Sequence, residues 1–165
     1  MTTQRLPLPL GIPDVGVYPS KLSSELSLTN AKQQECMTMP APTGSDIGAE
    51  TMFNVPATYV GTPKLVLRGI IDGTPANVFG IGAQLLEVAA AATVDAAYEA
   101  EDVASNSTWT GYADEEIYEL SITLTPASAF TAGREVLIRY YRDDSVDTQT
   151  INFLLTELFF EFNDA

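Results

Sequence analysis

The sequence predicts an all-β protein: an antiparallel β-sandwich preceded by an extended N-terminal arm. Eight of the ten prolines precede Lys64, and the runs that follow alternate apolar and polar residues. Clusters of turn-forming residues separate those runs at the spacing of an antiparallel sandwich. With 165 residues, of which 45% are hydrophobic and 18% charged, the chain suits one packed domain and an arm.

The predicted arm comprises residues 1–60. It opens with RLPLPLGIPDVGVYP, from Arg5 to Pro19, in which each proline fixes φ at about −65° and lacks a backbone donor. We expect this stretch to be extended and to become ordered on a partner's surface, through Leu6, Leu8, Leu10, Ile12, Val15, Val17 and Tyr18. Within the arm, only Ser20 to Glu35 favours a short helix, because Leu22 and Leu26 are spaced one helical turn apart.

Residues 61–165 form the predicted sandwich domain. Its first strand is KLVLRGII, Lys64 to Ile71, which a turn at Asp72-Gly73 ends. Two later runs have the period of two typical of half-buried strands. In the first run, Tyr118, Leu120, Ile122 and Leu124 share one face. In the second run, Val136, Ile138 and Tyr140 lie opposite Leu137, Arg139 and Tyr141.

One stretch allows two interpretations. Ala83 to Asp102 is rich in helix formers but holds no Lys or Arg that could form supporting ion pairs along a helix. We favour a strand over about residues 77–88 and a second near residues 97–103. A helix is the alternative.

The last predicted strand, NFLLTELFFEF, runs from Asn152 to Phe162. Strict alternation places Leu154, Leu158, Phe160 and Phe162 on one face. The other face carries Phe153, Leu155 and Phe159. A strand with two apolar faces is covered on both sides or buried against another subunit, so we expect these last three residues at a subunit interface.

Charge and composition exclude several classes of function. The net charge of −14 argues against direct contact with nucleic acid. No apolar run approaches the roughly 20 residues of a membrane span, and no signal peptide is recognisable, which predicts a soluble protein made in a cytoplasm. The single cysteine, Cys36, has no internal partner and is expected to be a structural thiol.

Catalytic chemistry is not expected. The chain has no histidine, so neither a Ser-His-Asp triad nor a Cys/His zinc site can form. We therefore predict no catalytic residue, no cofactor and no metal. Two acidic groups, Asp114 to Glu116 and Asp143, Asp144 and Asp147, could bind Ca²⁺, but solvated loop charges are the favoured interpretation.

A resemblance to known proteins rests on three stretches: TVDAAYEAEDV (93–103), ELSITLTPASAFTAGREVLIRYYRDDSVDT (119–148) and NFLLTELFFEF (152–162). Together they resemble the small jelly-roll sandwiches of tailed-bacteriophage virion proteins, such as capsid decoration or cement proteins. The resemblance implies a jelly-roll fold and a non-enzymatic virion component, often trimeric. It transfers no catalytic residue.

The expected function is therefore a capsid decoration protein on the outer surface of a phage head. Its partners would be the major capsid protein, bound by the arm, and copies of itself in a trimer. The alternatives are a carbohydrate-binding module on a head or tail appendage, with Trp109 and Tyr112 as a stacking platform, and a structural adaptor in the tail.

Overall fold

The computed structural model describes residues 1–13, 21–27, 33–88, 98–106, 116–125 and 130–165, and these residues form strands and connections without a helix. It accordingly contains no membrane-spanning helix in that part of the chain. The strands are β1 (Thr3–Leu8), β2 (Ile12–Pro13), β3 (Lys21–Ser27), β4 (Gln33–Met39), β5 (Ile47–Asn54), β6 (Tyr59–Asp72), β7 (Phe79–Val88), β8 (Asp102–Asn106), β9 (Ile117–Thr123), β10 (Glu135–Arg142) and β11 (Asn152–Asp164).

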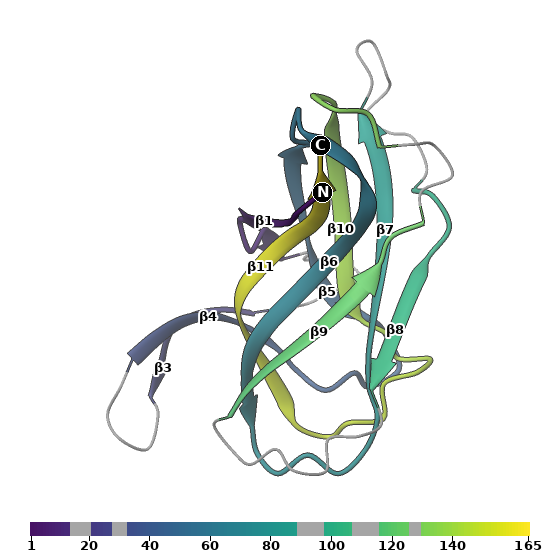
Figure 1. Ribbon diagram of the computed structural model, residues 1–165. Helices are drawn as coiled ribbons and strands as arrows, with labels where there is room; N and C mark the ends of the chain where they lie inside the picture. Colours follow the sequence, from purple (N-terminus) through teal and green to yellow (C-terminus); the bar gives the residue numbers. More distant parts are fainter. Residues whose placement is uncertain (14–20, 28–32, 89–97, 107–115, 126–129) are drawn as a thin grey trace.

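The strands form two antiparallel sheets packed as a sandwich (Figure 1). Sheet A has the order β3-β4-β11-β6-β9, with β1 also paired to β11, and sheet B has the order β2-β5-β10-β7-β8. From β4 onwards, the first four strands pair with the last four in reverse: β4 with β11, β5 with β10, β6 with β9 and β7 with β8. This is the order of a long hairpin rolled into two sheets, and it is compatible with the predicted jelly roll.

The predicted alternation is confirmed in β9 and in β10 up to Tyr140, whereas Tyr141 on the opposite face is buried too. Tyr118, Ile122 and Leu124 are buried and Leu120 packs against the same core, while Val136, Ile138 and Tyr140 are buried from the other sheet. The intervening residues of β9 are exposed. Burial of one face of each strand supplies the hydrophobic stabilisation that holds the sheets together.

A bulge in β11 changes the predicted faces of that strand. Leu155 lies opposite Gly69 of β6, whereas Glu157 lies opposite Arg68, so Thr156 is an extra residue. One extra residue reverses which face the following side chains occupy. Consequently Phe153 and Leu155 share the core with Leu158, Phe160 and Phe162, while Leu154 lies in a separate cluster with Cys36 and Ile70. The expectation that Leu154 faces the same way as Leu158 is wrong.

The ambiguous stretch contains no helix in its described residues, and its first part is a strand. Residues 83–88 belong to β7, which pairs with β8 and β10. Residues 98–101 are not helical, and 89–97 lie outside the described residues. The second strand begins at Asp102, which is later than the expected residues 97–103.

The boundary expected between residues 60 and 61 falls inside β6, which begins at Tyr59. Residues 1–60 contribute strands β1 to β5 as well as the start of β6. The expectation of a separate arm is therefore corrected. The physical reason has two parts. Strands of this region pair with β11 and β10 and so satisfy backbone groups of both sheets. The region also contributes apolar side chains to the core, namely Leu8, Met37, Met39, Ala49, Phe53 and Val55.

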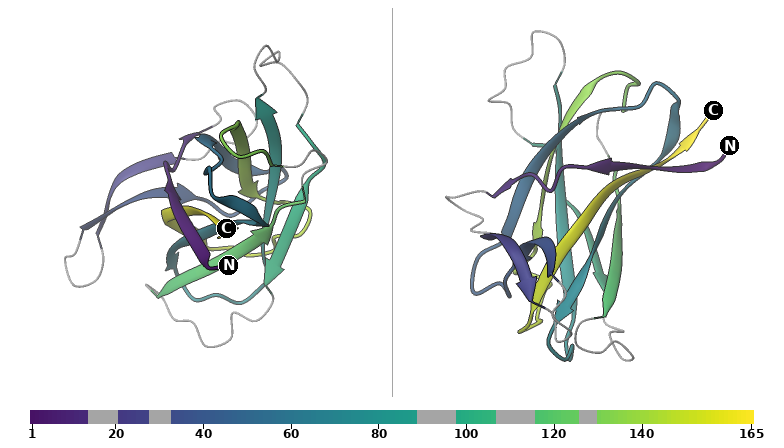
Figure 2. Two further views of the ribbon diagram at one scale, coloured as in Figure 1. Left: turned by 45° about the horizontal axis from the view of Figure 1, so that its top comes forward. Right: turned by 90° about the vertical axis from the view of Figure 1, so that its left-hand side faces the viewer.

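The helix expected at Ser20 to Glu35 is also corrected, because β3 and β4 form a hairpin there. Leu22 and Leu26 are four positions apart, a spacing that fits one helical turn and equally fits two strand repeats. Pairing of β4 with β11 decides in favour of the strand. The hairpin projects from the body of the sandwich (Figures 1 and 2).

Candidate interaction surfaces

The N-terminal segment packs on its own sandwich. β1 pairs with β11, placing Leu6 opposite Phe160 and Leu8 opposite Leu158. Leu8 is buried in the core, and Leu6 and Leu10 pack against it. The expectation that these three leucines bind a partner is therefore corrected: Leu8 is buried, and Leu6 and Leu10 bury part of their apolar surface against the same core.

The segment then crosses to the other sheet. The Tyr140 hydroxyl donates a hydrogen bond to the backbone carbonyl of Leu10, and Gly11 follows with a φ of +85°. A Cβ at Gly11 would lie 2.1 Å from the carbonyl oxygen of Glu50, so the close crossing requires glycine. Ile12 then lies opposite Glu50 in the pairing of β2 with β5. The predicted contact residues Val15, Val17 and Tyr18 lie outside the described residues.

Arg5 joins three strands of sheet A. Its Nη1 and Nη2 donate to the two carboxylate oxygens of Glu119 on β9, at 3.0 and 2.7 Å. Its Nε donates to Glu161 on β11 at 2.9 Å, and Lys64 donates to the second oxygen of Glu161 at 3.2 Å. The guanidinium lies 5.7 Å from the centre of the Phe159 ring. Arg5 thus covers the outer face of sheet A.

These contacts alter the titration of both charges. Hydrogen bonds from its guanidinium to Glu119 and then Glu161 raise the pKa of Arg5. Burial alone would raise the pKa of Glu161, but hydrogen bonds from Arg5 and Lys64, with their positive charges, lower it below its ordinary value. Glu161 is therefore held in its charged form.

The expected subunit interface on β11 is corrected for two of its three residues. Phe153 and Leu155 are 1% and 0% exposed within the chain itself, so neither is available to a second subunit. Phe159 is only half-buried and lies on the outer face beneath Arg5. The β11 bulge is the cause of this separation, since it divides the three residues between two faces.

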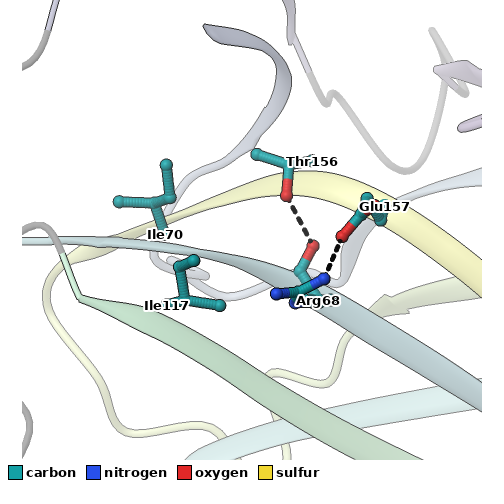
Figure 3. Close-up of a pocket in the computed structure, with 5 residues that line it drawn as sticks. All are labelled: Arg68, Ile70, Ile117, Thr156 and Glu157. Atoms are coloured by element: carbon teal, nitrogen blue, oxygen red, sulfur yellow. Dashed lines mark hydrogen bonds and ion pairs between the residues drawn. The ribbon is translucent and has the colours of Figure 1, made fainter. Parts of the chain in front are cut away.

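A small pocket opens on the outer face of sheet A beside the bulge (Figure 3). Ile70 and Ile117 form its apolar side, and the ion pair between Arg68 and Glu157, 2.7 Å long, forms its polar side. Thr156 donates to the backbone carbonyl of Arg68 at 3.1 Å. The volume of about 210 Å³ is below that of typical small-molecule sites, so a single side chain of a partner fits it better than a cofactor.

The apolar side of this pocket continues across the sheet. Ile117, Ile70 and Leu154 are direct neighbours in register on β9, β6 and β11. Ile70 and Leu154 are 6% and 4% exposed, but Ile117 is 58% exposed.

Cys36 lies in a cluster with Ile70 and Leu154. Its burial, and then the negative charge of Asp72, raises the pKa of the thiol, which agrees with the expected structural role.

The outer face of sheet B carries a polar and aromatic group. Arg139 donates to Glu50 at 2.9 Å, and the Tyr98 hydroxyl donates to the same carboxylate oxygen at 2.8 Å. The guanidinium of Arg139 lies 4.5 Å from the centre of the Tyr98 ring. Beside this group, Tyr141 donates to Glu101. Sequence reasoning missed this group, because its members are far apart in the chain.

The acids of the β10–β11 connection have structural roles. Arg142 is fully buried, and its Nε and Nη2 donate to the two oxygens of Asp147 at 2.8 and 2.9 Å. Its Nη1 donates to the carbonyls of Met39 and Ile151 at 3.1 and 2.7 Å. The Arg142 guanidinium also lies 5.2 Å from the ring centre of Phe79. This network ties the connection to the end of β4.

The other acids considered for Ca²⁺ are used locally or lie elsewhere. Asp143 accepts from the backbone and hydroxyl of Ser145 at 2.9 and 2.6 Å, and Asp144 accepts from the backbone of Gly44 at 2.8 Å. Across the described residues, no group of three or more His, Cys, Asp or Glu side chains could hold a metal ion. Asp114 and Glu115 fall outside that part of the chain, as do the Trp109 and Tyr112 of the proposed sugar platform.

The fold and these surfaces define an all-β, antiparallel β-sandwich protein. No family model matches the chain, and no curated protein matches it. The chain is similar to a solved structure described as "Family 16 Carbohydrate Binding Module-2". That structure is 12% identical, with 93% of this chain and 88% of that chain covered and a TM-score of 0.33.

Proposed function

We propose that this protein is a non-enzymatic structural component of a phage virion, a capsid decoration protein on the outer surface of the head. The stretches that resemble phage virion proteins include the start of β8, most of β9, all of β10 and most of β11. These four strands form one half of the rolled hairpin, and each pairs with a strand of the other half. The resemblance therefore concerns strands that organise both sheets.

The observation that carries the proposal is that the positively charged side chains form ion pairs within the sandwich. All five arginines and Lys64 form ion pairs within the sandwich. The chain has eight Lys and Arg against 22 Asp and Glu, so the charge left over is negative. Such a surface keeps a crowded coat protein soluble and away from the packaged nucleic acid. We propose the major capsid protein as its partner, with no membrane or nucleic acid involved.

The structure changes the proposed mode of attachment. A capsid contact through Leu6, Leu8 and Leu10 would require the N-terminal segment to leave its own core. The pocket beside Ile117 remains accessible, and the β3–β4 hairpin projects from the sandwich (Figure 1). We propose that Ile117 and this pocket contribute the capsid contact, because an exposed isoleucine next to a small pocket can bury an apolar side chain from a partner.

The test is co-sedimentation of the purified protein with assembled heads of the phage whose genome carries this sequence. We expect binding at a fixed stoichiometry and a higher temperature of head disruption. Ile117→Asp should weaken binding at least several-fold. Val60→Asp is the matched control, because Val60 is also exposed but lies on β6, and it should not weaken binding. Absence of wild-type binding to heads that lack the protein would contradict the proposal.

A carbohydrate-binding module on an appendage is the second candidate. The group of Tyr98, Arg139 and Glu50 favours it, since aromatic rings with flanking polar groups are suited to sugar rings. A glycan array would test it with wild type, Tyr98→Ala and Trp109→Ala. A sugar-dependent signal that is lost in either variant would support this candidate. An array without any signal would contradict it and would favour the decoration protein.

A further inference from the structure

Strand β9 is an end strand of sheet A. In the described part of the chain it pairs with β6, beside which it lies in Figure 1, and the order of the sheet ends there. The backbone of Ile71 donates to the carbonyl of Glu116 at 3.1 Å, and that of Leu124 donates to the carbonyl of Pro63 at 2.9 Å. The register between these two points is continuous.

These two hydrogen bonds fix the direction in which each backbone group of β9 points. In an antiparallel pair, alternate residues bond to the partner strand and the residues between them point away. Glu116 and Leu124 both bond to β6 or its flank, so the even-numbered residues of β9 face β6. The N–H and C=O groups that point away from β6 are therefore those of Ile117, Glu119, Ser121 and Thr123.

This edge of β9 is accessible to another chain. All four of its residues are exposed, and Ile117 is 58% exposed. Beyond the end of the strand, the backbone of Thr125 donates to Asp102 of β8 at 2.8 Å, so β8 borders the edge at that point. An end strand with exposed backbone donors and acceptors can pair with an added strand. Over the seven residues Ile117–Thr123, β9 has this character.

A side-chain contact lies at the start of the same edge. Ile117 belongs to the edge and also lines the pocket beside Ile70 (Figure 3). Ile117, Ile70 and Leu154 are neighbours in register across three strands. A strand paired with β9 places one residue directly opposite Ile117, on the same face and with its Cβ about 5 Å away. An apolar residue at that position extends the row by one strand and buries Ile117.

The charge around the edge selects the kind of strand that fits. The described residues 98–106 and 116–125, which include β8 and β9, contain no Lys or Arg and five acids: Glu99, Glu101, Asp102, Glu116 and Glu119. Pairing of β9 with β9 of a second copy would bring two such acidic segments together. A strand that carries Lys or Arg is complementary in charge instead. The edge therefore favours a cationic partner over a copy of this chain.

We propose that an extended, cationic segment of the major capsid protein adds to β9 as a further strand of sheet A. Its backbone bonds to the four outward-pointing residues of β9, and an apolar residue opposite Ile117 fixes its register. This inference rests on the proposed function and states how the surface around Ile117 is recognised.

Co-sedimentation with heads that lack the protein tests the backbone contact. Ser121→Pro removes a donor from the free edge and leaves the groups that bond to β6 in place. It should weaken binding by roughly 3- to 10-fold, as expected for one lost hydrogen bond. Ser121→Ala is the matched control, because it removes the hydroxyl and keeps the N–H, and it should bind as wild type does. Circular dichroism checks that both variants are folded.

A second pair of variants tests the charge of the partner. Ser121→Lys places a positive charge beside the added strand and should weaken binding by roughly 2- to 5-fold. Ser121→Glu introduces a side chain of similar length with the opposite charge and should not weaken it. Stronger binding by Ser121→Lys than by Ser121→Glu would overturn the assignment of a cationic partner.

Hydrogen exchange of the wild type needs no variant. Amide exchange over residues 117–123 should slow when the protein is bound to heads, because the outward N–H groups become bonded. Unchanged exchange there, or a Ser121→Pro variant that is folded and binds as tightly as Ser121→Ala, would overturn strand addition and leave the proposed function intact. Wild type that does not bind heads would overturn both. A dimer that forms without heads and is lost in Ser121→Pro, measured by sedimentation equilibrium, would overturn the capsid segment as the occupant.

Discussion

Arg5 and Glu119 are 114 positions apart in the chain and share two hydrogen bonds, at 3.0 and 2.7 Å. The contact runs from β1 to β9 over the outer face of sheet A, above Phe159. It shows that the proline-containing start of the chain is part of the sandwich.

Arg5→Met removes the ion pairs to Glu119 and Glu161 and should lower the free energy of unfolding by about 1 kcal/mol. The loss is small because water screens these partly exposed charges. Urea denaturation measures the change. Arg134→Met is the control: its Nε lies 3.9 Å from Glu87, and it should change stability by less than about 0.5 kcal/mol. Equal losses in the two variants would contradict an anchoring role for Arg5.

The lowered pKa of Glu161 predicts loss of stability in acid. Its pKa in the folded state lies below the ordinary value of 4.5, so the unfolded chain binds the proton first as pH falls. The stabilisation is complete above that ordinary value and disappears as pH falls through the lower, folded value. Thermal melting from about pH 6 to about pH 3 measures it. Glu161→Gln and Arg5→Met should each flatten the profile, and a wild-type slope in both would refute the assignment.

Leu8→Ala should cost about 2–4 kcal/mol, since it leaves a cavity in the core next to Leu158. Thr3→Ala, on the exposed part of the same strand, should cost at most about 0.5 kcal/mol. Chemical denaturation compares the two variants. An arm that is loosely attached would instead make Leu8→Ala as mild as Thr3→Ala.

Arg142→Met should cost about 3–5 kcal/mol, because it leaves the carboxylate of Asp147 buried without its partner. The double variant Arg142→Met/Asp147→Leu removes both charges and should recover part of that loss. Thermal denaturation of the wild type and the three variants of this cycle, including Asp147→Leu, measures the coupling. Additive effects of the two single changes would show that the pair contributes no specific interaction.

Much of the sandwich could be predicted from local pattern. β9 alternates between less and more exposed residues along its length, and β10 alternates up to Tyr140, after which Tyr141 and Arg142 are buried as well. Period and burial therefore agree over most of both strands. The start of the chain could not be assigned in this way. Its apolar residues are as suitable for a partner's groove as for a neighbouring strand of the same chain, and the choice depends on the free edge of β11, 150 residues later.

The sequence by itself determined that this protein is an acidic all-β sandwich, because alternation, turn residues and charge are local properties of the chain. The tertiary structure decided where the first 60 residues belong and which residues of β11 face the core. Thr156 illustrates the reason: one unpaired residue opposite β6 reverses the faces of everything after it. A bulge forms in response to the neighbouring strand, so the register of β11 depends on β6, β4 and β1 together.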